Sequence, residues 1–147
     1  MVGVANGRAE FGPRALGHRS LLADPRGPEI KDQVNEIKRR QKFRPFAPAI
    51  LEEHSKEYFS GPMNRYMQFV AKAKHDHKSV THIDGTARVQ IVEKDNKSIL
   101  RPILEEWYER TGCPMLLNTS LNIKGQPMVN NKKDADAFSK QYGVKVF

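Results

Sequence analysis

Three arginines and three glycines lie within fourteen residues near the start of the chain, from Gly7 to Ser20. Glycine lets backbone N–H groups approach an anion closely, and the planar guanidinium of arginine matches the oxygens of a phosphate. Pro13 restrains the backbone between the glycines. The segment therefore predicts a phosphate-binding loop, with Glu10 as a partner for one of the arginines. A turn-rich surface loop with solvated arginines is the alternative that these residues leave open.

A second group of cations runs from Lys38 to Lys42 and continues into Phe43, Arg44, Pro45 and Phe46. Dense charge runs are commonly solvated faces. Here, however, the rings and the proline should fix the backbone, so that an arginine is positioned rather than free. Cations beside aromatic residues are also typical of nucleic-acid surfaces, where phosphates and bases are bound together.

Arg88 begins a strand that we expect over residues 87–93, beside the apolar residues Val89 and Ile91. Because alternate side chains of a strand point to opposite faces, Arg88 should point away from Val89 and into a cleft. His82 and Asp84 are two residues apart, but no further closely spaced His or Cys accompanies them. We therefore expect a turn held by Asp84 and no metal site.

The fourth polar group, residues 118–122, follows a short apolar strand expected over residues 114–117. A buried strand that ends in Asn118, Ser120 and Asn122 is typical of a ligand-facing rim, and a self-capped polar turn is the alternative. No Ser/His/Asp order supports a hydrolase, and Cys113 has no evident activating partner, so we do not expect a nucleophilic mechanism. No Walker-type glycine loop occurs either.

Composition sets the frame for these groups. The 147 residues suit one domain, and a formal charge of +8 with a pI near 9.7 predicts attraction to anions. No apolar run approaches the roughly 18 residues that cross a bilayer, and the start of the chain lacks the layout of a signal peptide. With one cysteine and neither of these features, we expect a cytoplasmic location.

The elements that would position the polar groups alternate along the chain. A helix should begin near Pro28, because Ile30, Val34 and Ile37 form an apolar stripe. Further helices are expected over residues 98–110, ending at Gly112, and over 132–142. Strands are expected over residues 2–5, 20–23, 66–73, 87–93, 114–117 and 144–147. This order predicts one α/β or α+β domain with a mixed sheet.

Four segments of this sequence closely resemble the C-terminal domain of the carbamoyltransferase family, whose members carbamoylate nodulation factors and antibiotics. They are GRAEFGPRALGHRSLLADPR, KFRPFAP, THIDGTARVQ and LLNTSLNIKGQP, in the family's order and spread over residues 7–127. The resemblance implies that residues 1–147 form a carbamoyl-adenylate-forming domain with a twisted mixed sheet, similar to that of threonylcarbamoyl-adenylate synthases.

The same resemblance implies an activity and its ligands. In the family this domain activates carbamoyl phosphate with ATP and Mg²⁺, giving carbamoyl adenylate, phosphate and pyrophosphate. A separate N-terminal transferase domain holds an iron ion and moves the carbamoyl group to a hydroxyl. We expect that such a domain, in the same or another polypeptide, completes this chain, which alone should not carbamoylate an acceptor.

Carried over by position, the resemblance assigns Lys38, Arg44 and Arg88 to the charge of the reacting phosphates. Arg14 and Arg19 match the phosphate-binding loop, and Asn118, Ser120 and Asn122 match the polar rim; Arg39, Arg40 and Lys42 match less closely. Positioned cations can offset repulsion between two anions without covalent chemistry. The alternatives are a nucleotide- or phosphate-binding remnant without turnover and a basic nucleic-acid-binding module, which would carry its cations on a flat or convex surface.

Overall fold

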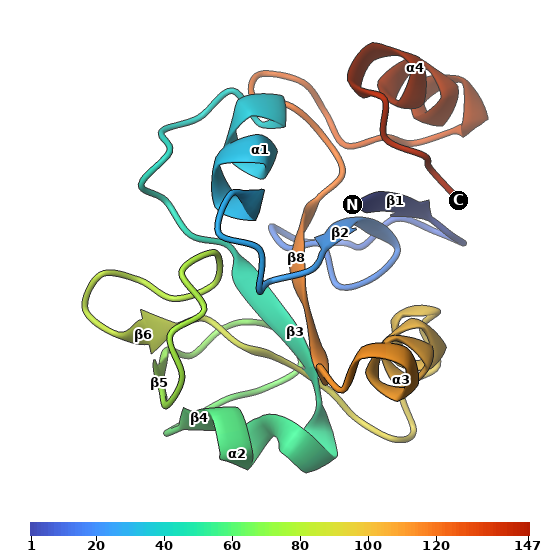
Figure 1. Cartoon of the computed structure of the whole chain (residues 1–147). Helices are drawn as coiled ribbons and strands as arrows, with labels where there is room; N and C mark the ends of the chain where they lie inside the picture. Colours follow the sequence, from blue (N-terminus) through green and yellow to red (C-terminus); the bar gives the residue numbers. More distant parts are fainter.

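A five-stranded sheet in the order β1–β2–β8–β3–β7 forms the centre of the fold (Figure 1). The computed structural model describes residues 1–147. The strands are β1 (Val2–Ala5), β2 (Arg19–Ala23), β3 (Ala47–Leu51), β7 (Gln90–Val92) and β8 (Met115–Ser120). Neighbours are antiparallel except β3 and β7, which are parallel. The mixed sheet and the α+β class are as the sequence predicts.

A smaller antiparallel sheet lies beyond β3 and contains β4 (Phe59–Ser60), β5 (Ala71–Ala73) and β6 (Thr86–Ala87). A 3₁₀ turn, η1 (Glu52–His54), and the short helix α2 (Ser55–Tyr58) connect the two sheets. The small sheet packs through Phe59, Ala71 and Ala87 against the end of the main sheet. It thereby fixes the loop before β7, which carries Arg88.

Helices cover both faces of the main sheet. Helix α1 (Ile30–Ile37) and helix α4 (Lys132–Tyr142) pack on the face that presents Leu21 and Leu117, whereas α3 (Leu100–Thr111) packs on the face that presents Leu22 and Leu116. Adjacent strand residues thus serve opposite layers, as the pleat requires. No helix is both long and apolar enough to cross a bilayer.

Local sequence signals explain the helix ends. Gly112 adopts a left-handed conformation, with φ of 67°, and ends α3 with its N–H on the Tyr108 carbonyl. Asn131 caps α4 by accepting from the Asp134 N–H, while the Asp134 carboxylate accepts from the Asn131 N–H. The α4 bounds agree with the prediction, and α1 ends at the basic cluster as expected.

Three strand predictions need correction. Only Ala71–Ala73 of the strand expected over residues 66–73 is extended in a sheet, because Met67 has a φ of 56° and breaks the strand. The strand expected over residues 87–93 divides into β6 and β7, with Arg88 and Val89 between them. Near the end of the chain, Val146 makes an isolated bridge to Gly3 instead of a full strand.

Strand β3, which lies between β8 and β7, was not predicted. Its sequence, APAIL, contains a proline and two alanines, which are poor strand formers. Pro48 pairs only with Leu117 of β8, whereas the contacts to β7 come from residues 49–51, so the proline lies outside that ladder. All five residues are buried, so the strand is held by its place between β7 and β8 rather than by local propensity.

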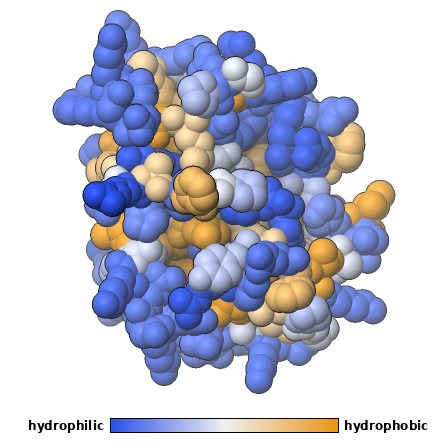
Figure 2. Space-filling model, turned by 180° about the vertical axis from the view of Figure 1, so that it is seen from behind, coloured by the Kyte–Doolittle hydropathy of each residue, from blue (hydrophilic) through white to orange (hydrophobic).

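Much of the surface is polar, as the composition predicts. Figure 2 shows one face that is mostly hydrophilic, with apolar atoms gathered near its middle. Two apolar side chains, Phe11 and Ile83, are fully exposed, and Phe43 is largely exposed. All three lie in loops that border the cavities described next.

Candidate anion-binding site

Three neighbouring cavities lie along the loops at the cationic side of the domain. Their volumes are about 900, 580 and 460 Å³. Arg40 and Arg44 line both the largest and the second cavity, and Arg88 lines both the largest and the third. The cavities therefore form a connected series in which arginines stand at each junction.

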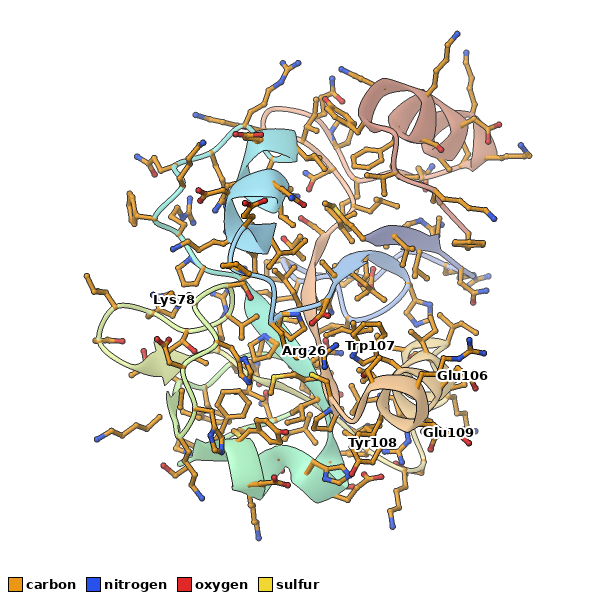
Figure 3. All side chains as sticks on the ribbon, viewed as in Figure 1. Arg26, Lys78, Glu106, Trp107, Tyr108 and Glu109 are labelled. Atoms are coloured by element: carbon orange, nitrogen blue, oxygen red, sulfur yellow. The ribbon has the colours of Figure 1, made fainter.

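The lining of this series is strongly cationic. The largest cavity is lined by six cations, Lys31, Arg40, Arg44, Lys74, Lys78 and Arg88, with Asp76 as its one carboxylate. The second is lined by five cations, Lys38, Arg39, Arg40, Arg44 and Lys124, and by no carboxylate. In Figure 3, Lys78 lies among the loops on the side away from α3. The cations occur in concave sites rather than along a flat stripe.

Lys38, directly after α1, is buried beneath the second cavity. Its Nζ donates to four oxygens, the Ser120 carbonyl at 2.6 Å and Oγ at 3.0 Å, and the Asn122 carbonyl at 2.7 Å and Oδ1 at 2.6 Å. Burial, followed by repulsion from Arg40, lowers the pKa of Lys38 to about 7. An ammonium has three protons for these four acceptors, so a ligand oxygen can replace a side-chain oxygen without loss of a hydrogen bond.

Arg40 is the most firmly positioned arginine of the cavities. Its Nε donates to Asn35 Oδ1 at 2.6 Å, one Nη donates to the Pro45 carbonyl at 3.0 Å, and its guanidinium lies 4.1 Å from the centre of the Phe46 ring. Burial, then repulsion from Arg44 and Arg88, lowers its pKa to about 10. The expectation that aromatic residues position an arginine holds for Arg40, but through Phe46 alone, because Phe43 is largely exposed.

Arg40 was among the residues that matched the family pattern less closely, so its position was underrated at the level of sequence. The available signal was its place between the helix end and Phe46. Arg39, the preceding residue, has a φ of 50°, a left-handed conformation that is uncommon for a residue with a side chain. This turn reverses the chain after α1 and directs Lys38 and Arg40 to the same cavity.

Arg44 and Arg88 lie on the cavities without carboxylate partners. The Arg44 side chain is exposed and makes no hydrogen bond within the chain. Arg88 is half-buried and its Nε is a buried donor without an acceptor. Burial, then repulsion from Arg14 and Arg44, lowers the pKa of Arg88. Arg88 therefore reaches the cavities as predicted, although from the connection between β6 and β7 rather than from within a strand.

Arg14 lines the third cavity together with Arg88. Its only hydrogen bond is a long one, 3.3 Å, to the carbonyl of Pro13. Repulsion links this series of cations. Besides burial, Arg40 lowers the pKa of Lys38, Arg44 and Arg88 lower that of Arg40, and Arg14 and Arg44 lower that of Arg88. Such an arrangement attracts anions electrostatically.

Arg19 occupies a different kind of position. Its side chain is buried, and all five N–H groups donate to backbone carbonyls, those of Val129, Asn6, His18, Gly7 and Asn130. No N–H remains for a phosphate, and Arg19 lines none of the three cavities. The structure therefore places Arg19 behind the loop, where it joins the two ends of residues 6–18 to residues 129–130.

The residues of the predicted polar rim also differ in whether they line a cavity. Ser120 and Asn122 line the second cavity with Lys38, and the Ser120 hydroxyl donates to Asn122 Oδ1 at 2.7 Å. Asn118 is buried, and its Nδ2 donates to the Ala15 carbonyl at 3.1 Å and to Gln90 Oε1 at 2.7 Å. Asn118 lines none of the cavities, so it lies behind the rim.

Two smaller predictions can be scored directly. Glu10 does not hold an arginine; its Oε1 accepts from the backbone N–H groups of Leu16 and His18, both at 2.7 Å. Asp84 holds a turn as predicted, because its Oδ1 accepts from the N–H and the hydroxyl of Thr86. No group of three or more His, Cys, Asp or Glu side chains is arranged to hold a metal ion.

A family profile described as "Carbamoyltransferase C-terminus" matches residues 1–147. The chain belongs to the carbamoyltransferase C-terminal family. It is 44% identical over 144 residues to nodulation protein NolNO of Sinorhizobium fredii. The aligned region covers 92% of this chain and 21% of that protein. It is 42% identical over 144 residues to nodulation protein NolO of Bradyrhizobium diazoefficiens, covering 92% of this chain and 26% of that protein.

Nodulation protein U of Rhizobium tropici is also similar, with 42% identity over 125 residues, 82% of this chain and 22% of that protein. The carbamoyltransferase C-terminal domain described here thus spans about a quarter or less of the length of these relatives.

Proposed function

We propose that this carbamoyltransferase C-terminal domain binds the phosphates of ATP and carbamoyl phosphate and joins carbamate to AMP, for later transfer by a separate domain. The observation that carries the proposal is the connected series of cavity cations that repel one another and lack carboxylate partners. Holding such cations close together and partly buried in the folded chain costs electrostatic free energy, and a bound anion offsets that free energy.

The number of cations suits two anionic ligands. ATP and carbamoyl phosphate each carry several negative charges, so bringing them together needs cations on more than one side. Lys38 with Ser120 and Asn122 offers a small polar site in the second cavity, and Arg88 with Arg14 forms another cationic site at the third. Arg40 and Arg44 stand between them.

In the proposed reaction, water first cleaves carbamoyl phosphate to carbamate and phosphate. A carbamate oxygen then attacks the α-phosphorus of ATP; the new P–O bond forms as the bond to the β-phosphate breaks, and pyrophosphate leaves. Lys38, Arg44 and Arg88 would stabilise the charge that develops on the phosphate oxygens, without covalent chemistry of their own. Mg²⁺ would enter with ATP and neutralise part of the charge of its phosphates.

The predicted site residues fall into two groups: those proposed to contact the ligand and those that hold other parts of the site in position. Lys38, Arg44, Arg88, Arg14, Ser120 and Asn122 line the cavities and are proposed to contact ligand, and Arg40 joins them. Arg19 and Asn118 use their N–H groups within the protein. We therefore propose that these two act by holding the loop of Arg14.

The test is ATP–pyrophosphate exchange by the purified chain with Mg²⁺, with and without carbamoyl phosphate, beside Arg88→Ala. We expect exchange that depends on carbamoyl phosphate and is lost in the variant. Saturable ATP binding without exchange would instead indicate a domain that needs its transferase partner for activation, or a binding remnant. Absence of ATP binding, with salt-sensitive binding of nucleic acid, would overturn the proposal.

A second experiment tests whether acceptor carbamoylation needs a separate transferase domain. Acceptor carbamoylation should require another domain, because this chain spans about a quarter or less of its relatives. A mixture of this chain with a transferase domain, an acceptor hydroxyl, ATP and carbamoyl phosphate should yield carbamoylated product. Product formation by this chain alone would show that the proposed division of work is incorrect.

A further inference from the structure

A pair of buried amides lies directly behind the third cavity. Gln90, the first residue of β7, is 1% exposed, and its Nε2 donates to the Leu16 carbonyl at 3.1 Å. Its Oε1 accepts at 2.7 Å from Asn118 Nδ2, which also donates to the Ala15 carbonyl at 3.1 Å. The two side chains therefore bind consecutive carbonyls of the loop that ends in β2.

Those carbonyls belong to the residues that follow Arg14, and Gln90 follows Arg88 by two residues. The amide pair thus connects the backbone next to one cavity arginine with the strand next to the other. Both arginines line the third cavity, and repulsion from Arg14 is among the causes that lower the pKa of Arg88. Without an anion between them, these two guanidinium groups favour separation.

Other contacts hold the two ends of the loop: Arg19 binds the Asn6 and Gly7 carbonyls, and the Ser20 hydroxyl accepts from the Gly17 N–H at 3.0 Å. Gly12 and Gly17 have φ values of 141° and 121°, conformations that residues with side chains rarely adopt. Glu10 binds the N–H groups of Leu16 and His18, so it organises the loop internally. Of the side chains that bind the loop's carbonyls 15 and 16, only Gln90 and Asn118 come from the sheet.

We infer that Gln90, through Asn118 and the loop carbonyls, is a positioning residue that sets the separation of Arg14 and Arg88 for a phosphate anion. This inference rests on the proposed function of the cavities. Gln90 does not contact ligand, since it is buried and lines none of the three cavities. Its effect on binding must therefore pass through Arg14.

The experiment is a double-mutant cycle on pyrophosphate affinity, measured by calorimetry with the parent chain, Gln90→Met, Arg14→Ala and the double variant. Methionine fills a similar volume but makes neither hydrogen bond. We expect Gln90→Met to weaken binding about tenfold in the parent and less than about twofold when Arg14 is already alanine, because the two residues act as one unit. A general loss of stability would weaken both backgrounds alike.

Two further variants guard the interpretation. Ser55→Ala removes a buried hydrogen bond, from Oγ to the Glu52 carbonyl at 2.7 Å, in a part of the fold that lines none of the cavities. It should leave pyrophosphate affinity unchanged. Gln90→Asn keeps an amide that is too short to span both partners, and it serves if methionine prevents folding; we expect the same dependence on Arg14.

The failures are distinguishable. Binding by the parent with additive losses in the double variant would overturn the positioning role alone. Unchanged affinity in folded Gln90→Met and Gln90→Asn would do the same. Absence of pyrophosphate binding by the parent would overturn the proposed function, and this inference with it.

Discussion

The two ends of strand β7 lie beside arginines in opposite electrostatic conditions. At its last residue, Val92, the side chain of Arg101 from helix α3 donates to the Val92 carbonyl at 3.0 Å, and also to both oxygens of Glu53 at 3.0 and 2.8 Å and to Glu105 at 2.8 Å. Glu53 is the main cause that raises the pKa of Arg101. Before its first residue, Arg88 has a buried Nε without an acceptor, and burial with repulsion from other arginines lowers its pKa.

The comparison shows how an arginine whose charge is paired within the fold differs from one whose charge is unpaired. Arg101 ties α3 to η1 and β7, so its charge is used within the fold. A second example is Arg26, which pairs with Asp24 at 2.8 Å and lies 5.5 Å from the centre of the Trp107 ring; Figure 3 shows the two residues side by side. Arg88 and the neighbouring cavity arginines lack carboxylate partners, and under the proposed function their charge binds an anion.

The largest expected effect is on binding. Arg88→Met should weaken pyrophosphate affinity by about 10- to 100-fold, because a charge-assisted hydrogen bond contributes about 1.5–3 kcal/mol and 1.4 kcal/mol is tenfold. The melting temperature should stay the same or rise, since the variant removes a cation that repels Arg14 and Arg44. Calorimetry and thermal unfolding measure the two quantities. A fall in melting temperature with unchanged pyrophosphate affinity would show that Arg88 has a structural role, like Arg101, and does not bind the anion.

The matched variant Arg101→Leu should give the reverse result. Loss of the bonds to Glu53, Glu105 and the Val92 carbonyl should lower the free energy of unfolding by about 2 kcal/mol, because the partners are only partly buried. For a chain of this size that is a fall of about 4–8 °C in melting temperature. Pyrophosphate affinity in the folded protein should not change. A tenfold loss of affinity would contradict the comparison.

A pH series separates the contribution of Lys38. Because its pKa in the folded chain is about 7, its charge is lost as pH rises through that value. Anion affinity should fall by up to about tenfold per pH unit above pH 7. Lys38→Met, with the same ligand, supplies the control, since it retains the titration of pyrophosphate itself. Equal pH profiles for the two proteins would contradict a role for the Lys38 charge in binding.

The same titration affects folding with a defined sign. The folded-state pKa of Lys38 lies below its ordinary value of 10.5, so the unfolded chain binds more protons between those values. The contribution of Lys38 to stability is therefore least favourable below about pH 7 and improves as the pH rises toward 10.5. Denaturant unfolding of the parent and Lys38→Met at pH 6 and pH 9 measures this difference.

The smallest expected effect concerns the ring beneath Arg40. Phe46→Leu removes a cation–π contact that contributes about 0.5–1 kcal/mol, which corresponds to about a two- to fivefold loss of anion affinity. The remaining bonds of Arg40, to Asn35 and to the Pro45 carbonyl, should hold the guanidinium close to its place. A loss as large as that of Arg88→Met would mean that the ring, rather than these bonds, determines the position of Arg40.

Sequence periodicity and capping signals were sufficient for several elements. The bounds of α4, the end of α3 at Gly112 and the stripe of α1 follow from local rules. Strand β3 could not be predicted in this way, because Pro48 and two alanines conceal a strand that only its neighbours stabilise. Tertiary context overrides propensity there.

The site was predictable as a set of cations but not as a set of roles. The motifs containing Arg14, Arg88 and Ser120 meet at the cavities, as expected for scattered residues that converge. The acceptors of Arg19, however, include carbonyls of Val129 and Asn130, more than a hundred residues away. No local pattern reveals such carbonyls, so a phosphate-binding arginine and a bracing arginine look alike in the sequence.

Repulsion among the cavity arginines lowers the free energy of unfolding of the domain, and a bound anion would offset it. An anion that binds only the folded chain stabilises it by about 2.7 kcal/mol when present at a hundred times its dissociation constant. For a chain of this size, that corresponds to a rise of about 5–11 °C in melting temperature. Under the proposed function, phosphate, sulfate and nucleotides in solution compete for the same cations. The melting temperature of this domain should therefore rise with the concentration of free anions in the solution.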